Sequence, residues 1–175
     1  MSDSKMLNPI IVLMGTGMRI GELCGLQWED INFDSNEIHI RHNLIYYDHR
    51  QKEENDLFKC RYEMETPKSK NGTRIIPMLP AVKNALLAQS AKTRGLRQNE
   101  VCGYSNFVFL TNQLTPILKV IGKNVRNLNK DLNYYLMDNG LDPVRPFTCH
   151  VFRHPYVKPT TKKFITFFEV FRAAS

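Results

Sequence analysis

Residues 15–25 read GTGMRIGELCG, and this stretch decides how the first elements of the chain follow one another. Its Gly-Thr-Gly opening should break a helix, because glycine readily adopts the conformations that end one. Thr16 can then cap a second helix, which would carry Arg19 and Glu22 and end near Gly25. Arg19 would lie in the first turn of that helix, where a cation has the wrong sign for the helix dipole.

On either side of this stretch the pattern changes from helix to strand. Asn8 and Pro9 suit the cap and the first turn of a short apolar helix that ends at Met14. Apolar residues then alternate over residues 31–33 and 38–44 around a polar turn. This alternation predicts a β-hairpin.

A second hairpin is predicted farther along the chain, with lysines near its tip. Residues 58–64 alternate again, residues 74–77 read as the returning strand, and Asn71-Gly72 is a strong signal for a tight turn. Lys68 and Lys70 would be carried on this hairpin, from which a lysine can reach across a cleft. On local sequence alone, solvated lysines at a turn are the simpler interpretation.

Two amphipathic helices complete the predicted core. The first should begin at Pro80, bury an apolar face that includes Ala88, and end near Gly95. The second should open at Thr115-Pro116 and stop at Asn139-Gly140, with apolar residues recurring every three or four positions between them.

The other face of the second helix carries a basic stripe, formed by Lys119, Lys123, Arg126 and Lys130. Such a stripe suits a phosphate backbone, although solvated lysines are the default interpretation. Together the elements predict an α+β fold, a mostly helical domain with a small antiparallel three-stranded sheet or hairpin.

The composition is that of one ordinary globular domain. The chain has 175 residues, of which 42% are hydrophobic and 23% charged, and no apolar run long enough to span a bilayer. Its four cysteines are far apart and suit free thiols in a reducing compartment, so we expect a cytoplasmic protein. A net charge of +7 favours a polyanionic partner. Without ligand motifs, the sequence predicts no metal and no cofactor.

A second cationic cluster lies at Thr148-Cys149-His150-Val151-Phe152-Arg153-His154. Thr148 can cap a helix, and His150 and Arg153, three residues apart, would project from one face. An anion bound at this helix start would offset the charge; the alternative is that both side chains are solvated in a loop.

Four of these groups together suit phosphoryl transfer. Arg19 and Arg153 could each hold non-bridging oxygens of a phosphate bidentately, while Lys70 or His150 moves a proton. Because the sequence offers no metal ligands, such chemistry would need a protein nucleophile.

Three segments resemble motifs of the tyrosine recombinases, the phage integrase family. Residues 15–31 resemble the first arginine motif, residues 66–77 the lysine hairpin, and residues 150–154 the HxxRH motif. The resemblance covers residues 8–154 and is greatest to the integrases of conjugative transposons.

This resemblance implies a domain that breaks and rejoins DNA, with double-stranded DNA and full-length recombinase protomers as partners and no membrane association. Arg19 and Arg153 would clamp the scissile phosphate, Lys70 would protonate the leaving 5′-hydroxyl, and His150 would assist proton transfer. The resemblance also implies supporting roles: Glu22 would orient or buffer Arg19, and His154 would be a further supporting residue. Lys68 is the alternative to Lys70 if the hairpin register slips by two.

The last 21 residues depart from the family. Pro155 interrupts the expected helix, at a cost of about 3 kcal/mol in a helix interior, and residues 155–175 match no family motif. Tyr156 is too close to Arg153 to be the family's nucleophile. We therefore expect one truncated catalytic domain over residues 1–175, inactive alone unless a partner supplies the tyrosine. A non-catalytic DNA-binding module or regulator and an inert remnant are the alternatives.

Overall fold

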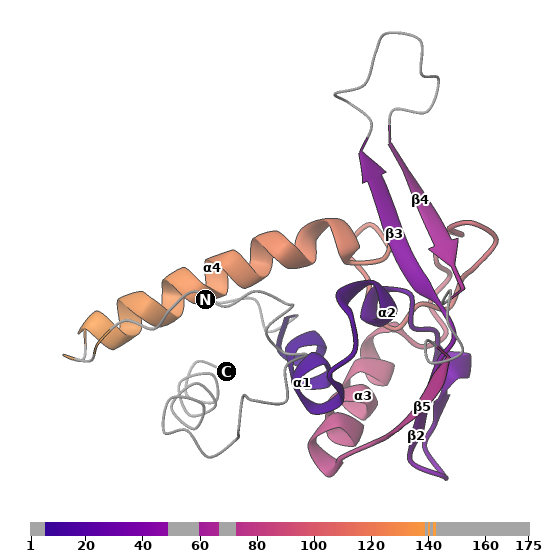
Figure 1. The fold of residues 1–175 in the computed structure, drawn as a ribbon, viewed down its shortest axis with the longest axis horizontal. Helices are drawn as coiled ribbons and strands as arrows, with labels where there is room; N and C mark the ends of the chain where they lie inside the picture. Colours follow the sequence, from indigo (N-terminus) through magenta and orange to yellow (C-terminus); the bar gives the residue numbers. More distant parts are fainter. Residues whose placement is uncertain (1–5, 49–59, 67–72, 139, 141, 143–175) are drawn as a thin grey trace, which may run out of the picture.

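The computed structural model describes residues 6–48, 60–66, 73–138, 140 and 142. Its elements follow in the order α1 (Leu7–Thr16), α2 (Ile20–Cys24), the 3-10 helix η2 (Trp28–Asp30), β1 (Ile31–Asn32), β2 (Glu37–Ile40), β3 (Asn43–Asp48), β4 (Cys60–Glu65), β5 (Arg74–Pro77), α3 (Pro80–Thr93) and α4 (Leu118–Asp138) (Figure 1). Among these residues every helix is too short or too polar to cross a membrane.

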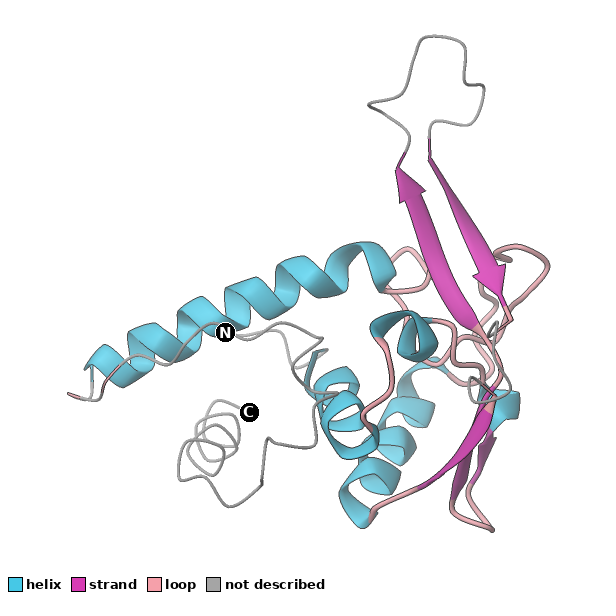
Figure 2. Ribbon diagram, viewed as in Figure 1, coloured by secondary structure: helices cyan, strands magenta, loops and turns pink. Residues whose placement is uncertain are grey.

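The strands form two small antiparallel sheets (Figure 2). In the first, β2 lies between β1 and β5, and Ile38 pairs with both Ile31 and Ile76. In the second, β3 pairs with β4, and together they form an arm that projects from the rest of the molecule (Figure 1). The α+β prediction with a small three-stranded antiparallel sheet is confirmed.

The predicted pairing of the second hairpin is wrong for the described residues. β4 pairs with β3 and β5 pairs with β2, so the strands expected to face each other lie in different sheets. Residues 38–44 are likewise not one strand, because the chain leaves the first sheet after Ile40 and enters the second at Asn43. A side-chain contact accompanies the observed pairing: Tyr46 and Tyr62 are opposite each other across β3 and β4, with ring centroids 5.1 Å apart.

The core is one cluster of buried side chains that includes residues of α1, α3 and the central strand β2, and α1 packs against α3 within it. Val12, Leu13, Ile38 and Leu86 are fully buried there. A Cβ atom at Gly15 would collide with the Val82 side chain, so this glycine allows α1 and α3 to approach closely. Gly15 and Thr16, expected to break the helix, are still part of α1.

α1 ends at Thr16, and Gly17 terminates it with a φ of 62°. At its other end the helix starts earlier than expected, since Met6 is the N-cap residue and Asn8 lies inside the first turn. Asn8 is buried and donates from Nδ2 to Oε1 of Gln89 (3.1 Å), whose Nε2 donates to the Val108 carbonyl (3.1 Å). The side chain expected to cap α1 therefore joins α1 to α3.

α3 confirms its predicted start at Pro80 and its end just before Gly95. Ala88, expected inside, is exposed, and Gln89 is buried in the hydrogen-bonded chain just described.

α4 starts later than predicted, at Leu118, because Pro116 forms a β-bridge with Leu110. Ile117, which precedes the helix, and Ile121 and Val125 within it are buried at the expected spacing. The helix ends at Asp138, as Asn139-Gly140 predicted, and its far half extends away from the strands (Figure 1).

Candidate active site

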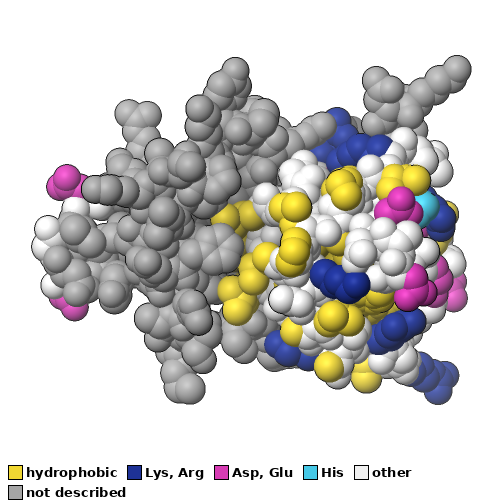
Figure 3. Space-filling model, turned by 90° about the horizontal axis from the view of Figure 1, so that it is seen from below, with side chains coloured by type: hydrophobic (Ala, Val, Ile, Leu, Met, Phe, Trp, Pro, Cys, Tyr) yellow, Lys and Arg dark blue, Asp and Glu magenta, His cyan; other side chains and the backbone are white. Residues whose placement is uncertain are grey.

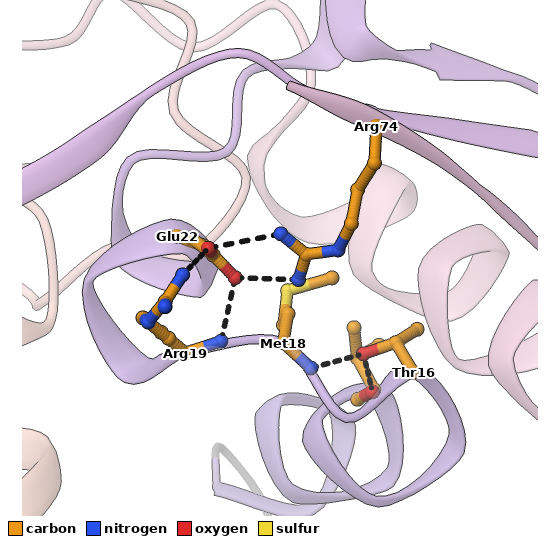
Figure 4. A network of polar contacts seen from close by, with 6 residues as sticks. Thr16, Met18, Arg19, Glu22 and Arg74 are labelled. Atoms are coloured by element: carbon orange, nitrogen blue, oxygen red, sulfur yellow. Dashed lines mark hydrogen bonds and ion pairs between the residues drawn. The ribbon is translucent and has the colours of Figure 1, made fainter. Parts of the chain in front are cut away.

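Arg19 and Glu22 lie together at the start of α2. Arg19 is the N-cap residue, with extended backbone angles of −72° and 154°, and its N–H donates to Oε2 of Glu22 (2.7 Å). Its guanidinium Nη1 donates to Oε1 of the same carboxylate (2.9 Å) (Figure 4). A glutamate three residues after the N-cap can reach back in this way and also suits the helix dipole.

This geometry corrects two details of the predicted helix. Arg19 precedes the first turn instead of lying in it, and Thr16 does not cap α2. The Thr16 hydroxyl instead donates to the Val12 carbonyl (2.6 Å) and accepts from the Met18 N–H (3.4 Å). The predicted end of α2 at Gly25 is confirmed.

Arg74, at the start of β5, completes the cluster. Its Nη1 donates to Oε1 of Glu22 (3.0 Å) and its Nη2 to Oε2 (2.8 Å), although the two residues are 52 positions apart (Figure 4). The sequence pattern predicted only that Arg74 lies in a strand. The one available signal was strand parity, since Arg74 shares a face with the half-buried Ile76.

The environment of Glu22 keeps it ionised. Burial would by itself raise the pKa of this carboxyl, whose side chain is only 1% exposed. Hydrogen bonds from Arg74 and from the backbone and side chain of Arg19 outweigh burial and lower the pKa from 4.5 to about 2. The same contact with Glu22 raises the pKa of Arg74. The cluster thus consists of two guanidinium cations and one carboxylate.

The exposed member of this cluster is Arg19. Its side chain is 49% exposed, whereas that of Arg74 is 29% exposed. Within the described part of the chain, the Arg19 guanidinium donates to Glu22 from Nη1 alone. A guanidinium has five N–H donors, so Arg19 can bind an anion from solvent while Glu22 holds it in place.

The remaining predicted site residues lie outside the described residues: Lys68, Lys70, His150, Arg153 and His154. Their placement relative to Arg19 therefore stays a prediction.

The basic stripe on α4 is exposed as expected. Lys119, Lys123, Arg126 and Lys130 are all solvent-accessible. The Lys119 Nζ also lies over the ring of Tyr46, 4.1 Å from its centroid, which joins α4 to the arm of β3 and β4. By contrast, the face seen in Figure 3 intersperses basic, acidic and apolar side chains among its described residues.

Comparison with known proteins identifies the family of the chain. The sequence profile of the phage integrase family matches residues 2–157. The chain belongs to this family of tyrosine recombinases. The resemblance that the three motifs indicated is therefore confirmed.

Curated relatives include mobile-element enzymes. The transposase from transposon Tn916 of Enterococcus faecalis is 30% identical over 154 residues, which are 87% of this chain and 35% of the relative. A XerC-like tyrosine recombinase of Caldanaerobacter subterraneus is 29% identical over 153 residues, 83% of this chain and 36% of that protein. The chain thus spans about a third of the length of these relatives.

Solved structures of recombinases are also similar to this chain. The Tn1549 transposon integrase in complex with transposon right end DNA is 29% identical, with a TM-score of 0.69 over 87% of this chain and 44% of that one. The XerA recombinase is 21% identical, with a TM-score of 0.56 over 99% of this chain and 45% of that one, and supports the fold alone.

Proposed function

We propose that this tyrosine recombinase chain acts in site-specific DNA recombination of a mobile element and that Arg19 binds the DNA phosphate at which strands are broken and rejoined. One observation carries the proposal: a half-exposed guanidinium is held by a buried, ionised carboxylate. This arrangement leaves N–H donors free for an incoming phosphate. Because Glu22 already holds the arginine in place, the Arg19 side chain loses little conformational entropy on binding. Relatives named as transposases and a DNA-bound integrase support it.

The other groups would act as the family resemblance implies. Arg153 would hold the same phosphate together with Arg19, Lys70 would protonate the leaving 5′-hydroxyl, and His150 would assist proton transfer. Lys119, Lys123 and Arg126 on α4 would contact the DNA backbone nearby, because all three are exposed.

The position of the nucleophile is a separate question. Tyr156 is the one tyrosine that follows the HxxRH motif in these 175 residues, and it lies three positions from Arg153. We infer that the chain binds DNA but forms no phosphotyrosyl bond unaided, and that a full-length recombinase protomer supplies the tyrosine.

Arg19→Ala should weaken duplex DNA binding by about 10- to 100-fold, the value of a charge-assisted hydrogen bond. It should also reduce the slope of log affinity against log salt by about one. Fluorescence anisotropy with labelled duplex DNA at several salt concentrations measures both.

Arg41→Ala is the matched control for this experiment. The Arg41 side chain is also 49% exposed and lies 3.4 Å from a buried acid, Asp30. An equal loss of affinity in both variants would show that general charge, and not the Arg19 site, binds DNA.

The inference that another protomer supplies the tyrosine predicts a second result. Purified chain incubated with a nicked suicide substrate should give no covalent protein–DNA band on a denaturing gel. Adding a full-length relative in which the first-motif arginine is replaced should restore the band if protomers share sites. A covalent band from the chain alone would contradict the inference about the nucleophile and leave the recombination proposal standing. DNA binding without any band in either arm would favour a non-catalytic regulator.

A further inference from the structure

Arg74 approaches the Glu22 carboxylate from the side opposite to Arg19. Each carboxylate oxygen accepts two hydrogen bonds, one from Arg19 and one from Arg74. Both terminal nitrogens of Arg74 are used in this fork. Glu22 therefore lies between two arginines that have different surroundings, one anchored in a sheet and the other half exposed.

The two arginines differ in how firmly their backbones are held. Arg19 caps a helix of only five residues, α2, which has little stability of its own. Arg74 belongs to β5 and pairs with Ile40 of the central strand β2. Ile40 is only 1% exposed. The sheet is thus the fixed reference, and Arg74 transmits its position to the carboxylate.

A bidentate fork determines more than the position of one atom. Two parallel N–H···O bonds from one planar guanidinium fix the plane of the carboxylate. Arg19 also reaches both oxygens, but one of its two bonds comes from the backbone and the other from a half-exposed side chain. That plane sets the direction in which Oε1 accepts from Nη1 of Arg19. It therefore also sets where the remaining Arg19 donors point.

We propose that Arg74 is a positioning residue that fixes the Glu22 carboxylate and, through it, the orientation in which Arg19 presents its guanidinium to a DNA phosphate. The proposal rests on the function proposed above for Arg19. It gives Arg74 no direct contact with DNA, because its terminal nitrogens are directed at Glu22.

The test is a double-mutant cycle of Arg19 and Arg74, measured by fluorescence anisotropy with the same labelled duplex. Lysine keeps the charge of Arg74 but cannot form the fork, so Arg74→Lys should weaken DNA binding about five- to tenfold, the size of one weakened charge-assisted hydrogen bond. Arg41→Lys is the control and should change affinity less than twofold. In an Arg19→Ala background, Arg74→Lys should have no further effect.

Two outcomes would overturn the proposal. A loss of affinity that persists in the Arg19→Ala background would mean that Arg74 contacts DNA itself. Unchanged affinity in Arg74→Lys with Arg19 intact would mean that the fork positions nothing. If Arg74→Lys does not fold, Arg74→Gln, which can still donate one hydrogen bond, is measured in the same way.

A readout without DNA separates this proposal from the proposed function. In side-chain NMR spectra, Arg74→Lys should shift the guanidinium signals of Arg19 and raise the titration midpoint of the Glu22 carboxyl, while Arg41→Lys should change neither. Unshifted Arg19 signals in a folded Arg74→Lys variant would refute the positioning role. If Arg74→Lys changes the Arg19 and Glu22 signals as expected but the wild-type chain fails to bind duplex DNA, only the DNA-binding function is refuted.

Discussion

Replacing Glu22 with alanine should lower the free energy of unfolding by about 1.5–3 kcal/mol, the value of hydrogen bonds to a charged group, because the two arginines it leaves are partly exposed. The substitution leaves Arg19 and Arg74 facing each other without the carboxylate that accepts four hydrogen bonds from them. It also removes the acceptor for the Arg19 N–H at the start of α2. Urea unfolding followed by fluorescence of Trp28, the single and buried tryptophan, measures the change.

Glu37→Ala is the control for this substitution. The Glu37 side chain is 41% exposed and lies 3.9 Å from His39, so its loss should cost less than about 1 kcal/mol. Equal stabilities of the Glu22→Ala and Glu37→Ala variants would contradict the role of Glu22 as the centre of the cluster. DNA affinity should fall in the Glu22 variant alone, because Arg19 loses its orienting partner.

Acid should destabilise the protein largely through the same carboxyl. The pKa of the Glu22 carboxyl is about 2 in the folded chain and 4.5 in the unfolded chain. The contribution of Glu22 to the free energy of unfolding is therefore fully present above pH 4.5. This contribution is lost as the pH falls from about 4.5 to about 2. The gap corresponds to about 3 kcal/mol, at about 1.4 kcal/mol per pKa unit.

Asp30 acts in the opposite direction. Burial raises the pKa of this carboxyl above 3.8 despite hydrogen bonding by the Gln27 N–H, so its protonation at low pH favours the folded state. Stability measured by urea unfolding from pH 6 to pH 2.5 should therefore fall more steeply in Asp30→Asn than in wild type. It should fall less steeply in Glu22→Gln. A wild-type profile that is flat over this range would contradict the low pKa of Glu22.

Local signals were sufficient for most of the helices and for one hairpin. Gly25 and Asn139-Gly140 predicted helix ends because glycine and asparagine adopt helix-ending conformations more readily than other residues. Pro80 predicted a helix start because its ring fixes φ at a helical value. The family resemblance also placed Glu22 beside Arg19, and the structure confirms the contact between these residues, which are three apart at a helix start.

Strand pairing and helix capping depended on distant residues. The sequence pattern of β4 is compatible with either β3 or β5 as a partner, and the contact of Tyr46 with Tyr62 accompanies the first pairing. Asparagine is a typical N-cap residue, but the Asn8 side-chain amide instead donates to buried Gln89, 81 residues away. Such contacts form only when the chain folds, and no local pattern encodes them.

The sequence by itself determined the family, the order of the elements and the pairing of Arg19 with Glu22, because all three depend on short motifs and local spacing. Only the tertiary structure decided that Arg74 completes the cluster. The physical reason is that a buried carboxylate must have its lone pairs satisfied, and the donor that does so comes from a strand brought alongside by the sheet.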